Sequence, residues 1–131
     1  MRISRELHDE IVAHALEDAP DECCGIVSSR DGEAVEVFRM ENTAHTWMRY
    51  EMDNMELYRV VTGIEDAGLD VGIIYHSHTR SEPYPSQTDI NFAKDWPGVL
   101  WIIVGLADGE PEVRTYEIRA GEVVDAALEI Q

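Results

Sequence analysis

Lysine is nearly absent from this chain, because Lys94 is the only lysine among the ten basic residues of a 131-residue sequence. Aspartate and glutamate together number 27, which gives a formal net charge of −17. A surface this negative repels the phosphates of nucleic acids and the headgroups of acidic lipids. The composition therefore argues against nucleic-acid and membrane partners and favours a basic peptide tail or a cationic patch. The more ordinary interpretation of the charge is a generally solvated acidic surface.

Long apolar runs are missing too, and none approaches the roughly 18 residues that a membrane-spanning helix needs. The first residues, Met1–Glu6, lead into an amphipathic helical pattern rather than a signal peptide. Together these two features predict a cytoplasmic location. A chain of this length without internal repeats or long linkers also predicts a single domain, residues 1–131, around one hydrophobic core.

Cysteine occurs only twice, at the adjacent positions Cys23 and Cys24. A disulfide between neighbours is strained, and two cysteines are too few for a four-cysteine structural zinc site. The pair therefore excludes a secreted disulfide framework and predicts two small buried side chains at the start of a strand. A hydrolase with a cysteine nucleophile is the weaker alternative, because no activating partner can be identified nearby in the sequence.

Helical and strand patterns alternate along the chain and predict an α/β protein, α+β-like, with a mixed sheet. The pair Asp31-Gly32 is the expected turn of a hairpin, and the apolar run Val99–Gly105 is the expected central strand, buried on both faces. His8 and His14 fall off the apolar stripe of the first helix, which predicts two solvated histidines. The expected elements are helices over 5–19, 53–67 and 87–95 and strands over 25–28, 34–40, 47–51, 71–78, 99–105, 112–119 and 122–126.

Two histidines, His76 and His78, lie two residues apart at the end of the apolar run Val71–Tyr75. If that run is a strand that continues to His78, its period of two places both imidazoles on one face. Asp89 lies one turn into a helix expected to begin after Ser86, so it could add a carboxylate oxygen. Three such ligands leave a fourth position open, as in a catalytic zinc site. A His-x-His pair alone is common by chance, but the spaced serine and aspartate favour a metal site.

Hydrolysis at such a site would need a general base, and any carboxylate within reach would serve. Glu22 precedes the first hairpin strand and could project into a cleft, although its position alone favours an ordinary exposed glutamate. Ser86 could donate a hydrogen bond to a developing oxyanion or only cap its helix, and one hydroxyl is not expected to do both in one conformation. His45 and Arg49 could approach a ligand from a polar loop, but solvent exposure explains them equally well.

The spacing His76-x-His78, seven residues, then Ser86-x-x-Asp89 resembles the signature of the JAMM (MPN+) zinc metallopeptidases, and Pro20–Gly25 resembles the segment that carries that family's catalytic glutamate. The resemblance implies a cytidine-deaminase-like fold, in which helices flank a mixed, largely antiparallel curved sheet. It also implies one Zn²⁺ per chain with a catalytic water, and His76, His78 and Asp89 as the zinc ligands. In the same way it implies Glu22 as the general acid/base and Ser86 as the oxyanion stabiliser.

The segments 74–79 and 82–89 are most similar to those of small stand-alone prokaryotic members, which release cysteine from the C-terminus of a ubiquitin-like (β-grasp) sulfur-carrier protein. The resemblance therefore implies a zinc-dependent peptidase that cleaves after the terminal glycine of such a carrier, with the carrier tail as its partner. The alternatives are an isopeptidase that removes ubiquitin-like modifiers from lysines and a non-catalytic MPN scaffold, which typically lacks the metal residues. The sequence leaves open which carrier is the substrate and whether the enzyme prefers a cysteine adduct or a lysine isopeptide. It also leaves open whether the protein is a monomer or a homodimer, and what role the two cysteines have.

Overall fold

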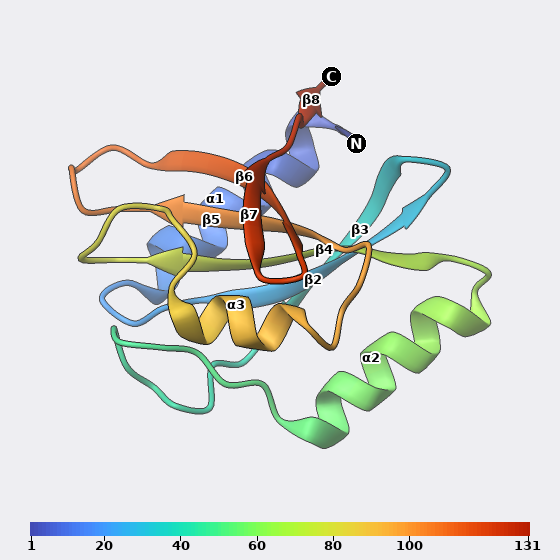
Figure 1. Ribbon diagram of the computed structural model, residues 1–131, viewed down its shortest axis with the longest axis horizontal. Coiled ribbons are helices and arrows are strands. Elements are labelled where there is room, and N and C mark those ends of the chain that lie inside the picture. The colour runs from blue at the N-terminus through green and yellow to red at the C-terminus, as the bar shows by residue number, and fades with distance from the viewer.

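A mixed sheet of eight strands forms the centre of the protein, and the computed structural model describes all of residues 1–131. The elements in chain order are β1 (Arg2–Ile3), α1 (Arg5–Asp18), β2 (Cys24–Arg30), β3 (Glu33–Met40), α2 (Asn54–Asp66), β4 (Asp70–His78), α3 (Gln87–Ala93), β5 (Leu100–Gly105), β6 (Glu112–Arg119), β7 (Glu122–Asp125) and β8 (Glu129–Ile130). The order across the sheet is β7-β6-β5-β4-β2-β3-β1-β8. Figure 1 shows α1 behind the sheet, and α2 and α3 in front of it. None of the three helices has the length and apolar character needed to cross a membrane.

Most neighbouring strands run antiparallel, since β2 pairs in this way with β3 and β4, and β6 with β5 and β7. The central strands β4 and β5 are parallel, so the sheet is mixed and the predicted fold class is confirmed. At one edge β1 pairs in parallel with β3 and β8, which brings the two chain ends side by side (Figure 1). Strands of two residues have no periodicity, so β1 and β8 are not predictable from the sequence pattern.

The pairing of β2 with β4 is regular from Cys24 opposite His76 to Val27 opposite Ile73. A β-bulge then shifts the register between Val27 and Ser28. The pairing of β2 with β3 shifts one residue later. The regular half of β2 therefore adjoins the end of β4 that carries the histidines, and the irregular half lies at the other end.

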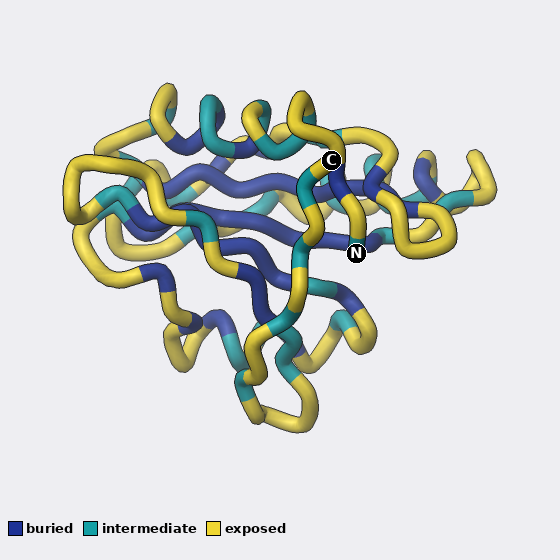
Figure 2. The backbone as a smooth tube through the Cα atoms, turned by 90° about the horizontal axis from the view of Figure 1, so that it is seen from above, coloured by how far each residue is buried: buried dark blue, intermediate teal, exposed yellow.

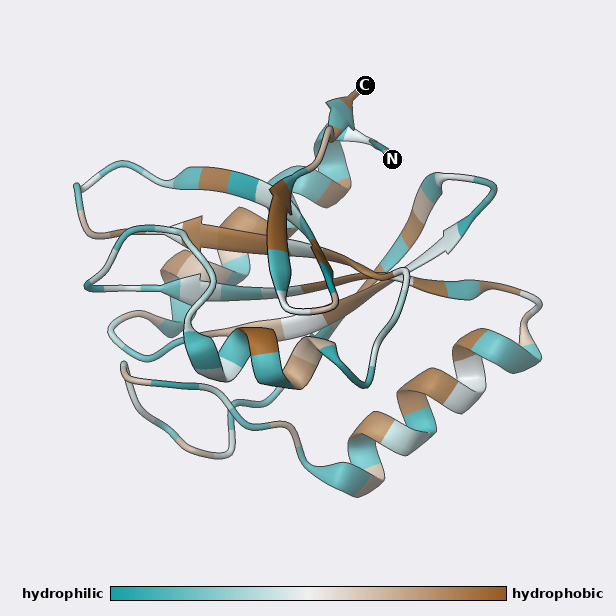
Figure 3. Cartoon of the chain, viewed as in Figure 1, coloured by the Kyte–Doolittle hydropathy of each residue, from teal (hydrophilic) through white to brown (hydrophobic).

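Each face of the sheet buries one hydrophobic layer. Ile73 and Tyr75 of β4 pack in the layer beneath α1, whereas Ile74 packs in the layer beneath α2 and α3, as a period of two requires. The central strands are buried along most of their length in Figure 2, and β5 is strongly hydrophobic in Figure 3. The central strand predicted over 99–105 is confirmed as Leu100–Gly105.

The adjacent cysteines lie on opposite faces of the sheet, with Cys23 in the layer beneath α1 and Cys24 in the other layer. Both are free and fully buried, which confirms the prediction of two small core side chains and explains why they form no disulfide. Burial raises the pKa of the Cys23 thiol to about 12 and that of Cys24 well above its ordinary value. Neither thiol supplies the thiolate that a cysteine nucleophile requires.

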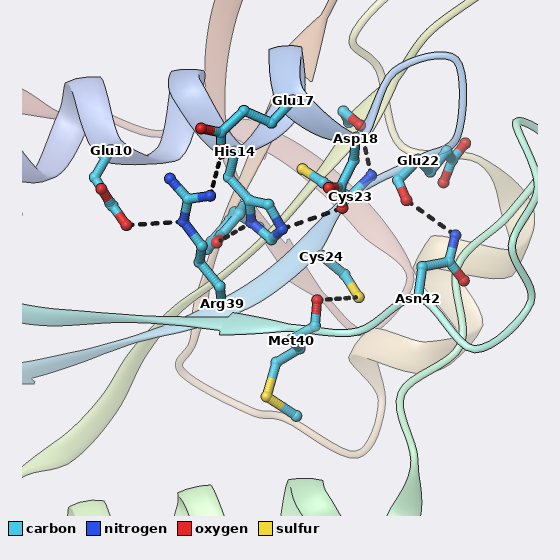
Figure 4. A network of polar contacts seen from close by, with 12 residues as sticks. Glu10, His14, Glu17, Asp18, Glu22, Cys23, Cys24, Arg39, Met40 and Asn42 are labelled. Atoms are coloured by element: carbon cyan, nitrogen blue, oxygen red, sulfur yellow. Dashed lines mark hydrogen bonds and ion pairs between the residues drawn. The ribbon is translucent and has the colours of Figure 1, made fainter.

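His14 is buried, so the prediction that it is solvated is wrong. Its Nε2 lies 3.2 Å from Asp18 Oδ2 and its Nδ1 lies 2.6 Å from the Tyr75 hydroxyl (Figure 4 shows the surrounding network). Because the Asp18 carboxylate accepts from Nε2–H, Nδ1 is the acceptor and the Tyr75 O–H donates to it. Burial lowers the pKa of His14, which favours this neutral form. His8 is only partly exposed and pairs with its neighbour Asp9.

Gly25 is required by the ring of Tyr75, which lies opposite it on β4. A Cβ atom at position 25 would overlap the ring and the hydroxyl of Tyr75. We expect Gly25→Ala to lower the free energy of unfolding by about 3 kcal/mol, the upper range for overpacking a core, as measured by urea denaturation. Gly63→Ala is the matched control, because a Cβ atom there meets nothing within 4 Å and lies inside α2. That variant should gain about 0.5–1 kcal/mol, and equal effects at both positions would contradict the close packing.

Candidate metal centre and active-site cleft

Three side chains from the end of β4 and the start of α3 converge on one point. His76 Nε2 lies 3.1 Å from His78 Nε2 and 3.1 Å from Asp89 Oδ2, and His78 Nε2 lies 3.4 Å from the same oxygen. Ligand atoms at about 2.0–2.1 Å from a tetrahedral zinc ion are about 3.4 Å apart. His76, His78 and Asp89 therefore have the spacing and the donor types of a site for a divalent metal, and all three are buried. These three residues are called the metal group below.

Asp89 is held in place by the cap of α3. Its Oδ2 accepts a hydrogen bond of 2.9 Å from the Ser86 backbone N–H, and Ser86 Oγ accepts one of 3.1 Å from the Asp89 backbone N–H. This reciprocal capping box confirms that Ser86 caps the helix. The capping bond uses a lone pair of Oγ, so the O–H remains free to donate. The expectation that capping excludes a second role for Ser86 is therefore wrong.

The two histidines are oriented in different ways. His78 Nδ1 donates to the Glu82 carbonyl at 2.9 Å, which leaves the lone pair of its Nε2 directed at the convergence point. His76 instead packs against Tyr50, with ring centroids 4.6 Å apart. Its Nδ1 and the Tyr50 hydroxyl are both buried without hydrogen-bond partners. Tyr50 was not singled out by any sequence pattern, because its contact with His76 depends on how the loop after β3 folds.

The electrostatics of the group keep Asp89 ionised. Burial on its own would raise the pKa of Asp89, but His76, His78 and the Ser86 N–H outweigh it and hold that pKa well below the ordinary value. Burial likewise opposes the charged form of His78, yet the Asp89 carboxylate and the Glu82 carbonyl raise its pKa above the ordinary value. An anionic oxygen beside two imidazole nitrogens is the state in which these residues would receive a metal.

Glu22 is buried and lies beside the metal group, so the prediction from position alone of an exposed glutamate is wrong. The register that places Cys24 opposite His76 continues for one more residue, because Ser77 N–H donates to the Cys23 carbonyl and Cys23 N–H to Ser77 Oγ. One further step brings Glu22 opposite His78, and opposite residues of an antiparallel pair project to the same face. Burial raises the pKa of Glu22 to about 8, while His78 works to lower it.

The segment predicted as a strand over 47–51 is part of a loop between β3 and α2 and forms no strand. Asn42 organises this loop: its amide donates to the Glu22 and Arg49 carbonyls, each at 3.0 Å, and its side-chain oxygen accepts from the Ala44 and Glu51 N–H groups. Figure 4 shows the contact with Glu22. A single asparagine in a polar loop carries no sequence signal for this role, so the sequence did not reveal that Asn42 supports the loop and the Glu22 backbone beside the site.

The loop after β3, the metal group and the start of α3 enclose a cleft of about 760 Å³. His45 is exposed and lies outside the cleft, which agrees with the interpretation of His45 as a solvent-exposed loop residue. Arg49 lines the cleft. The residues that line the cleft include Glu22, Trp47, Arg49, Tyr50, His78, Arg80, Ser86 and Asp89.

Comparison with known proteins is consistent with this geometry. Residues 4–119 match the family model described as prokaryotic homologs of the JAB domain. The "CysO-cysteine peptidase" of Mycobacterium tuberculosis is 34% identical over 131 residues, covering 98% of this chain and 89% of that protein. The "Desampylase" of Haloferax volcanii is 34% identical over 111 residues, covering 79% and 78% respectively. The solution structure of protein DSY2949 from Desulfitobacterium hafniense has the same fold, with a TM-score of 0.85, 24% identity and coverage of 99% and 92%.

Proposed function

Because the chain belongs to the family of prokaryotic homologs of the JAB domain, we propose that it is a zinc-dependent peptidase acting on a ubiquitin-like sulfur-carrier protein. The bond cleaved is the amide after the carrier's C-terminal glycine, and the product released is cysteine. The observation that carries this proposal is the convergence of two imidazoles and a carboxylate beside the buried Glu22 in one cleft. The identity with the mycobacterial CysO-cysteine peptidase, over nearly the whole chain, supports the substrate class.

Zinc is the proposed metal, held by His76, His78 and Asp89, because two imidazole nitrogens and one carboxylate oxygen suit it. When bound, zinc would act as a Lewis acid that polarises the scissile carbonyl and makes water a better nucleophile.

The protein's own residues would handle the proton and the developing charge. Glu22 takes a proton from the attacking water, whose oxygen bonds to the glycine carbonyl carbon, and passes that proton to the leaving nitrogen as the C–N bond breaks. The Ser86 O–H, free while Oγ accepts the capping bond, donates to the oxygen that becomes negative. A divalent cation beside Glu22 would lower its pKa and favour the carboxylate that a base requires.

A lysine isopeptidase is the second candidate. The identity with the desampylase of Haloferax volcanii supports it, and the bond broken would again follow a terminal glycine. Both reactions would use the same catalytic residues, so the two candidates differ only in the group on the leaving side.

Direct assay tests the leading proposal. We expect protein reconstituted with zinc to bind about one ion per chain and to release one cysteine from CysO-cysteine, the substrate after which the mycobacterial relative is named, as followed by mass spectrometry. Chelation should abolish the reaction, and added zinc should restore it. A protein that binds no zinc, or that binds it and leaves CysO-cysteine intact, would overturn the proposal. Cleavage of only a modifier–lysine conjugate would favour the second candidate.

A further inference from the structure

The cleft contains one arginine without an acidic partner. Two arginines line it, Arg49 and Arg80. Arg49 Nε lies 3.3 Å from Glu51 Oε1 and is therefore paired. Arg80 takes part in none of the ion pairs of the protein. In a chain with a net charge of −17, an unpaired cation beside the metal group is available to a ligand.

Arg80 is also held in position at two points. Its guanidinium carbon lies 4.2 Å from the centre of the ring of Trp47, which also lines the cleft. The residue before it, Thr79, donates its hydroxyl to the Pro20 carbonyl at 2.9 Å, which fixes the backbone directly after His78. Stacking occupies the face of the guanidinium and leaves its N–H edge free to donate.

The N–H edge of a guanidinium matches a carboxylate, which it can bind through two parallel hydrogen bonds. A cysteine attached through its amino group has its α-carboxylate on the carbon next to the scissile nitrogen. The leaving side of a lysine isopeptide has a run of methylenes at that place and no charge. The net charge of the protein repels a free carboxylate, so a cation on the leaving side of the bond, in addition to the proposed zinc, would favour the binding of that group.

We infer that Arg80, stacked on Trp47, binds the free α-carboxylate of the amino acid on the leaving side of the bond. This contact selects carrier–amino-acid adducts over lysine isopeptides. The inference rests on the function proposed above and deepens it by naming a residue that sets specificity.

A pair of matched substrates isolates this contact. CysO-cysteine is compared with the same adduct ending in cysteinamide, which differs only in lacking the charged carboxylate, using zinc-loaded protein of full length. We expect Arg80→Ala to raise KM for the acid roughly tenfold more than for the amide, because only the acid loses a hydrogen-bonded charge pair. Arg80→Lys keeps the charge without the planar fork and should lie between the two. Arg59→Ala is the control, because Arg59 is also exposed and unpaired but lies outside the cleft.

The outcomes separate the two proposals. If wild-type protein hydrolyses acid and amide with equal kcat/KM, or if Arg80→Ala slows both substrates equally, the carboxylate contact is wrong while the peptidase function stands. If the wild type hydrolyses neither adduct, the proposed function itself fails. A preference for the acid that disappears in Arg80→Ala and persists in Arg59→Ala supports the inference.

Discussion

Glu22→Gln is expected to lower kcat by roughly 100- to 10,000-fold, the range attributed to general acid–base catalysis, while zinc stays bound. The amide has nearly the shape of the carboxylate but cannot accept and return a proton. Glu22 is separate from the three ligand atoms that converge at the metal site, so zinc content measured by mass spectrometry should match that of the wild type.

A matched control makes this result specific. Glu51→Gln removes another carboxylate from the cleft, one that is exposed and paired with Arg49, and should have little effect on kcat. A Glu22→Gln variant with full activity and bound zinc would contradict the mechanism.

The same substitution should change how stability depends on pH in the metal-free protein. Burial raises the pKa of Glu22 from 4.5 to about 8, so the folded state holds this proton more tightly than the unfolded chain does. Its contribution to stability is complete below pH 4.5 and is lost as the pH rises to about 8. Glutamine does not titrate, so the variant should become the more stable of the two proteins as the pH rises through this window, as measured by urea unfolding with chelator present.

Asp89→Asn is expected to weaken zinc binding by more than about 100-fold. Loss of a residue that only hydrogen-bonds to a metal ligand already costs up to about 100-fold in affinity, and Asp89 is itself a proposed ligand. The asparagine oxygen can still accept from the Ser86 N–H, so α3 keeps its cap while the site loses its only anionic ligand. Competition with a chromophoric chelator measures the affinity directly. Asp95→Asn is the control, because it makes the same charge change at an exposed position just after α3. Unchanged affinity in the Asp89 variant would exclude Asp89 as a ligand.

The metal group was predictable from the sequence because each of its parts is local. The shared face of His76 and His78 follows from the period of a strand, and the place of Asp89 follows from the cap at Ser86. The helix predicted over 53–67 is likewise confirmed as Asn54–Asp66, because its apolar spacing and its cap at Asp53 lie within one short segment.

What the sequence did not reveal depends on partners far along the chain. Glu22 faces the site only because β2 pairs with β4 in one register, more than fifty residues away. His14 is buried because Tyr75, 61 residues later, supplies the donor that a buried imidazole needs. The segment 47–51 has residues that suit a strand but no strand beside it, and the side chain of Asn42 satisfies its backbone instead.

The bulge in β2 has a consequence for how the chain tolerates changes in length. An added or lost residue near Ser28 falls where the ladder is already irregular, so the β2–β3 hairpin can vary there without disturbing the other end of the strand. A change of one residue between Glu22 and Val27 has the opposite result, because every side chain before it turns to the other face. Glu22 would then point toward α1, away from the metal group. Changes in length are thus tolerated in the half of β2 that follows Val27, whereas the half that adjoins the histidines of β4 requires a fixed number of residues.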